Sequence, residues 1–435
     1  MSGTSTFLSE FKKLPDSTLI TSKEPPYRKI GIICEGKLPP DRRVPLTPAQ
    51  CRSALARYPQ LDLVVQRSNV RAFGDAEYED AGVRLVDDLA DRELIIGVKE
   101  VPLDMLLPGK SYLFFTHTIK EQPHNQKLLR AVLDRKITLM DHELLTNEHG
   151  ERVLAFGHWA GVVGAYNAFR AWQLVHDGTP LKPAHECHDL EELEQHLHAL
   201  PLLKDLRIVM TGGGRVGKGA IGILERAGVL RVKPDEFLHG HFDKPTYTVL
   251  NSADLYERID GKPFDRDAFH QDPTGHRSRF LAYARRAHIY VACHFWDPRG
   301  PKILTAEDLR DPKMSLQVIA DISCDVGGPI DSTLRASTIA EPFYGYDPVT
   351  GSETDAGRKG AVTVMAVDNL PAELPRDASD FFGNDLLGKV LPELLGDDAG
   401  GMIARATIAK AGELTERHKY LEAYARGDKK VGQTS

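Results

Sequence analysis

Three stretches of this chain each have the pattern of an apolar strand that ends in side chains able to move protons or bind carboxylates. Residues 94–98 precede Lys99 and Glu100, residues 112–115 precede Thr116 and His117, and residues 137–140 precede Asp141, His142 and Glu143. In an open α/β sheet, ligands bind beyond the carboxyl ends of parallel strands. The pattern therefore predicts that Lys99, His117 and Glu143 meet at one edge of a parallel sheet.

A fourth apolar stretch, residues 206–210, runs into a glycine-rich turn. The turn consists of Gly212, Gly213, Gly214, Arg215, Val216 and Gly217. Glycines in this spacing let the backbone approach a pyrophosphate, whose charge then lies at the start of the following helix. An edge rich in acid and base groups, together with a dinucleotide-binding turn, indicates a dehydrogenase.

The nicotinamide cofactor that such a turn would hold is NAD or NADP. An acidic residue that binds the ribose is usual about 20 positions after the turn. Residues 231–236 occupy that place and carry both signs of charge. Basic side chains nevertheless outnumber acidic ones near the turn, which favours NADPH. The basic residues are Arg215, Lys218, Arg231 and Lys233.

Composition narrows the class of protein. The 435 residues suffice for about two or three domains. A net charge of -7 gives no basic surface for nucleic acid. No apolar run is long enough to span a membrane, and the polar start lacks the pattern of a signal peptide, so we expect a cytoplasmic protein. The five cysteines have no CxxC spacing, which indicates unpaired thiols.

The order of patterns along the chain predicts two β/α domains. A polar arm precedes the first strand, and Thr47 and Pro48 are suited to start a helix that runs to about Tyr58. We expect a substrate domain at residues 27–155 plus 361–435 and a dinucleotide-binding domain at 156–345. Small residues at helical spacing in 156–168 predict a closely packed connecting helix. We expect a long loop at 342–360 and a strand at 361–367. The apolar spacing of residues 385–395 and 403–426 predicts C-terminal helices.

Each candidate residue also has an ordinary structural interpretation. Lys99 fits a solvated strand end, and His117 fits a core histidine, yet their shared position favours an acid/base pair. Arg43 and Arg152 are suited to carboxylate binding but equally to an open surface. A metal site is not expected. The histidines and Cys187 at positions 185–198 flank an acidic run typical of a solvated amphipathic helix rather than of a zinc site.

Five longer motifs carry a family resemblance. They are residues 115–122 (FTHTIKEQ), 152–161 (RVLAFGHWAG), 212–219 (GGGRVGKG), 320–330 (ADISCDVGGPI) and 367–375 (VDNLPAELP). These motifs resemble the lysine-2-oxoglutarate reductase half of bifunctional aminoadipate semialdehyde synthases, and more distantly the lysine-forming saccharopine dehydrogenases. The resemblance implies two Rossmann-like domains with an active-site cleft between them. It also implies reductive condensation of lysine with 2-oxoglutarate to saccharopine with NAD(P)H, or the reverse.

The resemblance further implies roles for single residues. Lys99 and His117 would form the acid/base pair, Glu100 and Glu143 would tune it, Arg43 and Arg152 would hold substrate carboxylates, and Asp368 would lie near the cofactor. Because the chain ends at Ser435 without a second half, we expect the reductase step alone. Two alternatives stay open: an alanine-dehydrogenase-like enzyme, and a non-catalytic NAD(P)-binding relative. The sequence does not indicate an oligomeric state.

Overall fold

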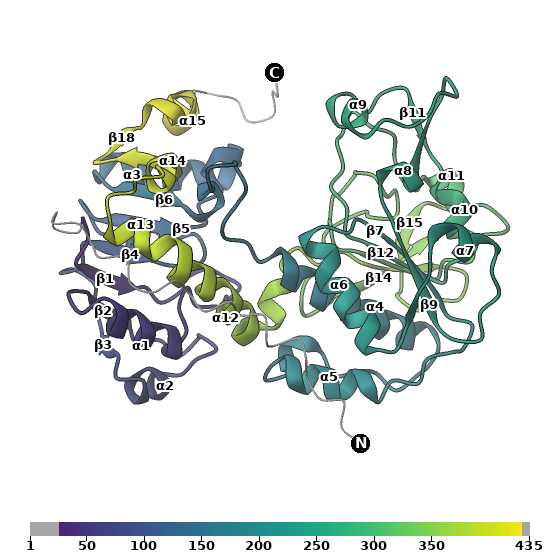
Figure 1. The fold of residues 1–435 in the computed structure, drawn as a ribbon, viewed down its shortest axis with the longest axis horizontal. Coiled ribbons are helices and arrows are strands. Elements are labelled where there is room, and N and C mark those ends of the chain that lie inside the picture. The colour runs from purple at the N-terminus through teal and green to yellow at the C-terminus, as the bar shows by residue number, and fades with distance from the viewer. Residues whose placement is uncertain (1–25, 429–435) are drawn as a thin grey trace. The chain divides into compact units, whose positions relative to one another are not determined.

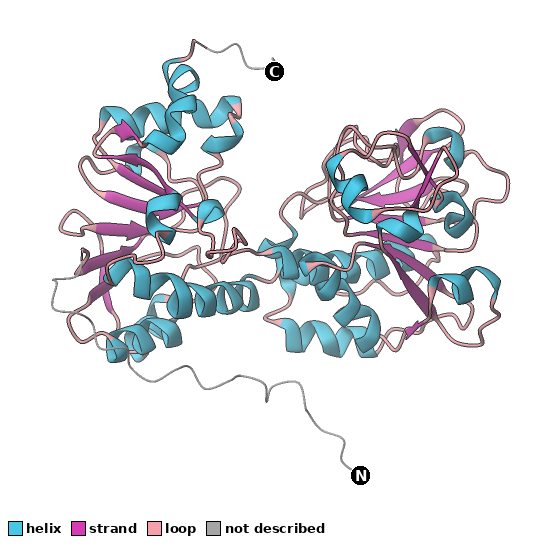
Figure 2. Cartoon of the chain, turned by 45° about the horizontal axis from the view of Figure 1, so that its top comes forward, coloured by secondary structure: helices cyan, strands magenta, loops and turns pink. Residues whose placement is uncertain are grey.

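The computed structural model describes residues 26–428, which divide into two compact units. One unit contains the described residues up to 155 and from 379 onward, and the other contains residues 156–378. Each unit is built on an eight-stranded sheet flanked by helices (Figures 1 and 2). The expected α/β class with two Rossmann-like sheets is therefore confirmed. The predicted N-terminal arm lies, up to residue 25, outside the described residues.

The sheet of the first unit is parallel over most of its width. Its strands lie in the order β18 (Glu413–Leu414), β17 (Thr407–Lys410), β6 (Thr138–Asp141), β5 (Ser111–Phe114), β4 (Leu94–Ile96), β1 (Lys29–Ile32), β2 (Asp62–Gln66) and β3 (Arg84–Val86). The pairs from β6 to β3 are all parallel, and β17 pairs antiparallel with β6. β4, β5 and β6 are therefore direct neighbours that point the same way.

The helices of this unit are mostly short. They are α1 (Pro48–Arg57), α2 (Asp75–Asp80), α3 (Gln126–Asp134), α13 (Leu391–Leu395), α14 (Met402–Ala406) and α15 (Glu422–Arg426), with 3-10 turns η1 (Leu103–Met105), η2 (Thr118–Lys120), η3 (Pro123–Asn125), η4 (His142–Leu144) and η8 (Glu416–Leu421) and the π-helical η7 (Leu386–Val390). The predicted start of α1 is confirmed, because Thr47 accepts from the Gln50 backbone N–H in a capping box. The unit boundary falls within α12 (Pro375–Asp385).

The second unit has the strand order of a dinucleotide-binding sheet with an added hairpin. The order is β15 (Ser352–Thr354), β14 (Phe343–Asp347), β16 (Val362–Met365), β13 (Val318–Asp321), β12 (Ile289–Ala292), β7 (Arg207–Thr211), β9 (Thr246–Leu250) and β8 (Leu230–Arg231). A separate ribbon pairs β10 (Tyr256–Arg258) with β11 (His276–Ser278). The chain order reverses between β7 and β12, the position at which such sheets bind ligands.

Helices of the second unit include one long, closely packed pair. The helices are α4 (Gly157–Val175), α5 (Leu190–His198), α6 (Arg215–Arg226), α7 (Pro234–His239), α8 (Ser252–Leu255), α9 (Arg266–Gln271), α10 (Phe280–Ala284) and α11 (Ala306–Leu309), with 3-10 turns η5 (Ala184–Glu186) and η6 (Leu370–Glu373). A Cβ on Gly161 would lie 1.9 Å from the Val216 carbonyl oxygen, and one on Gly219 would lie 2.0 Å from that of His158. The small residues predicted from 156–168 therefore allow α4 to contact α6 directly.

Two predictions about the later chain are wrong. Residues 342–360, expected as a loop, contain the antiparallel strands β14 and β15. The strand predicted at 361–367 is present as β16, but it pairs with β13 and so belongs to the second unit. The chain returns to the first unit at residue 379 rather than 361. All four residues of β16 are buried, and an apolar run of this kind does not reveal which of two sheets it joins.

Of the two C-terminal segments predicted as helical, residues 385–395 are helical, whereas residues 403–426 contain a strand hairpin between α14 and the helical residues 416–426. β17 and β18 follow α14, and the turn between them places Ala411 and Gly412 at φ values of 50° and 87°. β17 adds to the edge of the sheet beside β6, which brings the yellow end of the chain next to a blue strand in Figure 1. Pairing with β6 overrides the local helical pattern.

Candidate active site

The first unit brings the predicted acid and base residues to one edge of its sheet. Lys99 lies three residues beyond the end of β4, His117 three beyond β5, and Glu143 two beyond β6. Because these three strands are adjacent and parallel, their carboxyl ends open on the same side. The sheet topology therefore places Lys99, His117 and Glu143 at the same edge of the sheet, as predicted from the sequence.

Glu100 links two basic side chains at this edge. Its Oε1 lies 2.5 Å from His117 Nδ1, and its Oε2 accepts from Lys37 Nζ at 2.9 Å. Burial raises the pKa of the Glu100 carboxyl, but the hydrogen bonds from His117 and Lys37 outweigh burial and lower the pKa to about 2. Glu100 therefore stays ionised and orients the imidazole through Nδ1, which assigns proton exchange to Nε2.

Lys99 is the second group suited to proton transfer. Burial is the main cause that lowers its pKa from 10.5 to about 8, and the charges of Arg43 and Lys37 lower it further. The nearby carboxylates of Asp41 and Glu100 act in the opposite direction. An amine with a pKa near the working pH can both accept and release a proton during a reaction.

The end of β1 contributes charged residues that the sequence interpretation missed. Glu35, Lys37 and Asp41 follow this strand, as Arg43 does, and β1 is the neighbour of β4. The Arg43 guanidinium is 1% exposed and forks onto Asp41, with Nε to Oδ1 at 2.9 Å and Nη2 to Oδ2 at 2.6 Å. Burial raises the pKa of Asp41, but Arg43 brings it well below its usual range. Arg43 is thus part of a buried pair, not a surface arginine.

Glu143 collects two cations at the end of β6. Its Oε1 lies 3.2 Å from Lys120 Nζ and 3.4 Å from Arg152 Nη1. The Arg152 side chain is 42% exposed, whereas that of Glu143 is 15% exposed. The structure therefore brings Arg152 to the same edge as Glu143, where its guanidinium is accessible to a ligand carboxylate.

The two residues before Glu143 have structural contacts instead. Asp141 is fully buried and accepts from the backbone N–H groups of Thr116 and Glu143 at 3.2 and 2.8 Å. His142 is also fully buried, with Nε2 2.9 Å from the Gly97 carbonyl oxygen, and burial lowers its pKa to about 4. Of this triplet, Glu143 is the residue that forms ion pairs with Lys120 and Arg152.

A change at Lys99 offers a test of its environment. We expect Lys99→Met to stabilise the protein at pH 7 by about 1 to 3 kcal/mol, because the folded state disfavours the protonated amine. The pKa of Lys99 is about 8 in the folded state, and an unfolded lysine titrates at about 10.4. Between these values the unfolded chain binds more protons, so wild-type stability rises with pH and the advantage of methionine shrinks. Urea unfolding at pH 7 and pH 10 measures this, and an equal difference at both would contradict it.

The glycine turn of the second unit fits a pyrophosphate. Gly212 has φ +86°, and a Cβ on it would lie 2.5 Å from the Cys293 carbonyl oxygen. A Cβ on Gly217 would lie 2.1 Å from the Gly212 carbonyl oxygen, so both glycines are needed to form the turn. A Cβ on Gly214, the N-cap of α6, meets nothing within 4 Å. Gly214 directly precedes the first turn of the helix, where backbone N–H groups attract a phosphate.

Asp368 lies apart from this turn. It is exposed and follows β16, which is separated from β7 by β13 and β12. Its charge helps to raise the pKa of Cys324, after the burial of that thiol. The structure therefore places Asp368 along the carboxyl edge of the same sheet but does not bring it to the glycines.

The segment 185–198, which contains the histidines and Cys187, forms the predicted amphipathic helix α5 over residues 190–198. α5 buries Leu193 and Leu197, and the side chain of its N-cap Asp189 accepts from the Glu192 backbone N–H. Ligand atoms of Cys187, Glu192 and His196 all lie within 4.8 Å of one another. The carboxylate in this group already pairs with Lys182 Nζ at 2.5 Å and accepts from the His188 backbone N–H. These contacts account for the carboxylate without an ion.

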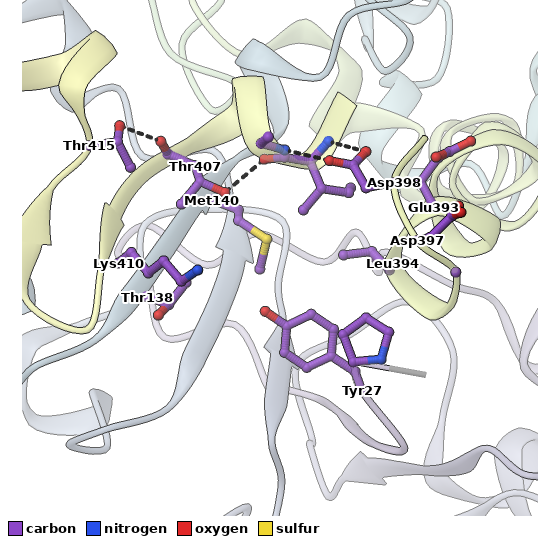
Figure 3. Close-up of a pocket in the computed structure, with 14 residues that line it drawn as sticks. Tyr27, Thr138, Met140, Glu393, Leu394, Asp397, Asp398, Thr407, Lys410 and Thr415 are labelled. Carbon is purple, nitrogen blue, oxygen red and sulfur yellow. Dashed lines mark hydrogen bonds between the residues drawn. The ribbon is translucent and has the colours of Figure 1, made fainter. Parts of the chain in front are cut away.

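A cavity of 560 Å³ in the first unit does not coincide with the candidate site. Its walls are formed by Tyr27, by Thr138 and Met140 of β6, and by residues of α13, α14 and β17 (Figure 3). Asp398 lines the cavity, and its carboxylate oxygens accept from the Ile403 and Ala404 backbone N–H groups. None of the sequence-predicted site residues lines this cavity.

Comparison with known proteins identifies one family model and several enzymes that are similar to this chain. Residues 31–163 match the family model described as alanine dehydrogenase/PNT, N-terminal domain. The chain is 32% identical to alpha-aminoadipic semialdehyde synthase of Arabidopsis thaliana, over 90% of this chain and 41% of that protein. It is 29% identical to saccharopine dehydrogenase [NAD(+), L-lysine-forming] of Emericella nidulans, over 83% of this chain and 91% of that protein. The chain is therefore similar to each of these enzymes over most of its own length.

The homology confirms the resemblance inferred from the motifs. The mitochondrial synthase of Rattus norvegicus is 31% identical over 88% of this chain, and this chain spans less than half the length of either synthase. Among solved structures, an L-alanine dehydrogenase has a TM-score of 0.62 at 18% identity and covers 92% of this chain and 99% of its own. A Sinorhizobium meliloti transhydrogenase has a TM-score of 0.54 at 16% identity, covering 89% and 99%. Both support the fold alone. Within residues 26–428, no helix is long and apolar enough to cross a membrane.

Proposed function

We propose that this chain is an NAD(P)-dependent oxidoreductase of the saccharopine dehydrogenase type. It condenses the ε-amine of lysine with the ketone of 2-oxoglutarate and reduces the resulting imine to saccharopine, or runs the reverse reaction. The observation that supports this best is the pairing of His117 with ionised Glu100 beside Lys99, whose pKa is near 8. Homology with an enzyme named as a lysine-forming saccharopine dehydrogenase supports the same reaction.

The chemistry requires several proton transfers that these residues are suited to perform. The amine nitrogen bonds to the ketone carbon, and the resulting carbinolamine takes up a proton at its hydroxyl and loses water. We assign these transfers to the Lys99 amine and to His117 Nε2. When bound, the reduced nicotinamide supplies the hydride that reduces the imine carbon. In the reverse direction, the same two groups deliver and accept the protons of imine hydrolysis.

The substrate carboxylates are assigned to the arginines of the same edge. We propose that Arg152, exposed beside Glu143, binds one carboxylate and that Arg43 provides positive charge for another. Asp41 fixes the Arg43 guanidinium, and Glu143 restrains Arg152. Glu100 and Glu143 act by tuning and orienting their basic partners. Asp368 stays a proposed contact near the cofactor.

Oxidation of reduced cofactor distinguishes the proposed reaction from its alternatives. We expect turnover with lysine plus 2-oxoglutarate and little or none with pyruvate plus ammonia. Turnover with pyruvate and ammonia alone would identify an alanine-dehydrogenase-like enzyme. A chain that binds the cofactor but turns over neither substrate pair, and that also does not oxidise saccharopine in the reverse reaction, would be a non-catalytic relative.

For the cofactor we propose a preference for NADPH over NADH. A pocket lined by Arg231, Lys233 and Val249 adjoins the glycine turn, because a Cβ on Gly213 would lie 3.8 Å from Val249 Cγ1. The residue directly after β9 is the neutral Asn251, whose side chain caps α8. Glu236 also lines this pocket, and its carboxylate accepts from the Lys233 backbone N–H at 3.0 Å, so two cations outnumber one carboxylate where a 2′-phosphate would lie. The fungal relative, by its name, uses NAD(+), so the preference proposed for this chain differs from the cofactor of that relative.

Neutralising this pocket should change the choice of cofactor. We expect Arg231→Ala combined with Lys233→Ala to weaken NADPH binding about 10- to 100-fold with little change for NADH, because only NADPH carries the additional phosphate. Lys244→Ala, at an exposed position of the same unit, is the matched control. Fluorescence titration of both cofactors measures the effect. Equal losses for both cofactors, or a wild-type preference for NADH, would refute the preference.

A further inference from the structure

The Glu35 carboxylate occupies a distinctive place at the end of β1. The last backbone hydrogen bond between β1 and β4 runs from Ile33 N–H to the Ile96 carbonyl at 3.0 Å. Beyond it, Glu35 Oε1 accepts from Val98 N–H at 2.6 Å and Oε2 from Lys99 N–H at 2.9 Å. The carboxylate thus continues the ladder of hydrogen bonds after the two strands separate.

The other side of the same segment is held by β5. Phe115 N–H donates to the Val98 carbonyl at 3.0 Å, and Gly97 N–H donates to the Leu113 carbonyl at 3.0 Å. Glu35 therefore supplies, on the β1 side, the acceptors that keep the backbone of Val98 and Lys99 in place. A carboxylate that accepts two backbone N–H groups forms charge-assisted bonds, which are stronger than neutral ones.

From this geometry we propose that Glu35 is a positioning residue for Lys99. It contacts the backbone of Lys99 rather than its amine, and it acts on the reaction only by fixing where that amine lies. The proposal rests on the function proposed above, in which Lys99 transfers protons. Displacement of a reacting group by about 1 Å can cost about 100-fold in rate, so the backbone contact matters for catalysis.

The titration of Glu35 is consistent with this role. Burial raises the pKa of its carboxyl to about 7, against the two backbone hydrogen bonds and the charge of Arg43, while the charge of Asp41 adds to the effect of burial. Ionising Glu35 in this site therefore costs free energy that an ordinary surface glutamate would not incur, and the carboxylate form predominates above about pH 7.

Glu93 offers a matched control at the opposite end of the same two strands. Its Oε2 accepts from Arg28 N–H at 2.7 Å and Lys29 N–H at 3.0 Å, at the start of β1. Glu93→Gln therefore alters a carboxylate that accepts two successive backbone N–H groups, as Glu35→Gln does, but away from the carboxyl edge. If the Lys99 pKa or kcat changes only in Glu35→Gln, the change cannot result merely from weakening a carboxylate contact with two backbone N–H groups.

The experiment measures the titration of Lys99 without relying on turnover. Trace acylation of amines across a pH series, read out by peptide mass spectrometry, gives the pKa of Lys99 in each variant. Once the backbone is released and the amine reaches solvent, we expect Glu35→Gln to raise this pKa by about one unit or more. In wild type and in Glu93→Gln, burial should keep the pKa of Lys99 lowered to about 8.

The outcomes separate this proposal from the proposed function. Glu35→Gln should also lower kcat for lysine plus 2-oxoglutarate about 10- to 100-fold with unchanged cofactor affinity. An unchanged Lys99 pKa would overturn the positioning role, and so would a lowered one, since loss of an attracting charge acts in that direction. Absence of turnover in the wild type, together with a raised Lys99 pKa in Glu35→Gln, would refute the proposed reaction and retain the positioning role.

Discussion

Replacing Lys99 with methionine should lower kcat about 10²- to 10⁴-fold for lysine plus 2-oxoglutarate, because the reaction then lacks a positioned acid/base group. His117→Gln should have an effect of the same order, since the amide cannot exchange protons at neutral pH. Cofactor affinity should not change in either variant, because the glycine turn belongs to the other sheet. Steady-state kinetics and cofactor titration measure the two quantities separately.

The controls for this pair are a second lysine, Lys127, and the double variant. Lys127 is exposed on α3 of the same unit, and Lys127→Met should leave kcat unchanged. The double variant of Lys99 and His117 should lose less than the product of the two single losses, because the residues share one set of proton transfers. Wild-type turnover in both single variants would remove these residues from the chemistry. A loss caused by unfolding is excluded if Lys99→Met is stabilised as expected.

Gly214→Val should abolish nucleotide binding while leaving the fold intact. Gly214 has φ -73°, which valine can adopt, and its Cβ position is open to 4 Å, so the side chain fits the protein alone. The valine would instead fill the space through which a pyrophosphate approaches the start of α6. Titration with reduced cofactor, alongside thermal unfolding, measures both properties.

Gly74→Val is the matched control for this change. Gly74 is the N-cap of α2 in the first unit, with φ -67° and no atom within 4 Å of its Cβ position. Valine is a poor N-cap, so each variant should lose up to about 1 kcal/mol of stability. Only Gly214→Val should lose the cofactor. Unchanged affinity in that variant would place the nucleotide elsewhere.

The edge of the first sheet could be predicted from sequence because its strands alternate regularly with helices. Lys99, His117 and Glu143 each follow a short apolar run, and parallel neighbours align their carboxyl ends. The same rule applied to the first strand would have found Glu35 and Lys37, which lie directly beyond β1. They were missed because a glutamate and a lysine in a proline-containing loop look like ordinary solvated residues.

Other features depended on pairing between distant segments. β17 forms only because β6 offers an edge more than 260 residues earlier in the chain, and no local pattern records that partner. The burial of Arg43 likewise depends on its fork with Asp41, and a sequence of charged residues does not indicate which are enclosed. Position on a strand end was predictable, whereas partners and burial required the three-dimensional structure.

Product analysis with labelled lysine tests the central claim most directly. The protein would be incubated with lysine carrying ¹⁵N at the ε position, 2-oxoglutarate, pyruvate, unlabelled ammonium and NADPH, and the products analysed by mass spectrometry. The account predicts saccharopine that contains the ¹⁵N, formed in step with cofactor oxidation and lost in Lys99→Met. Cofactor oxidation that yields alanine or glutamate with unlabelled nitrogen, and no labelled saccharopine, would contradict it.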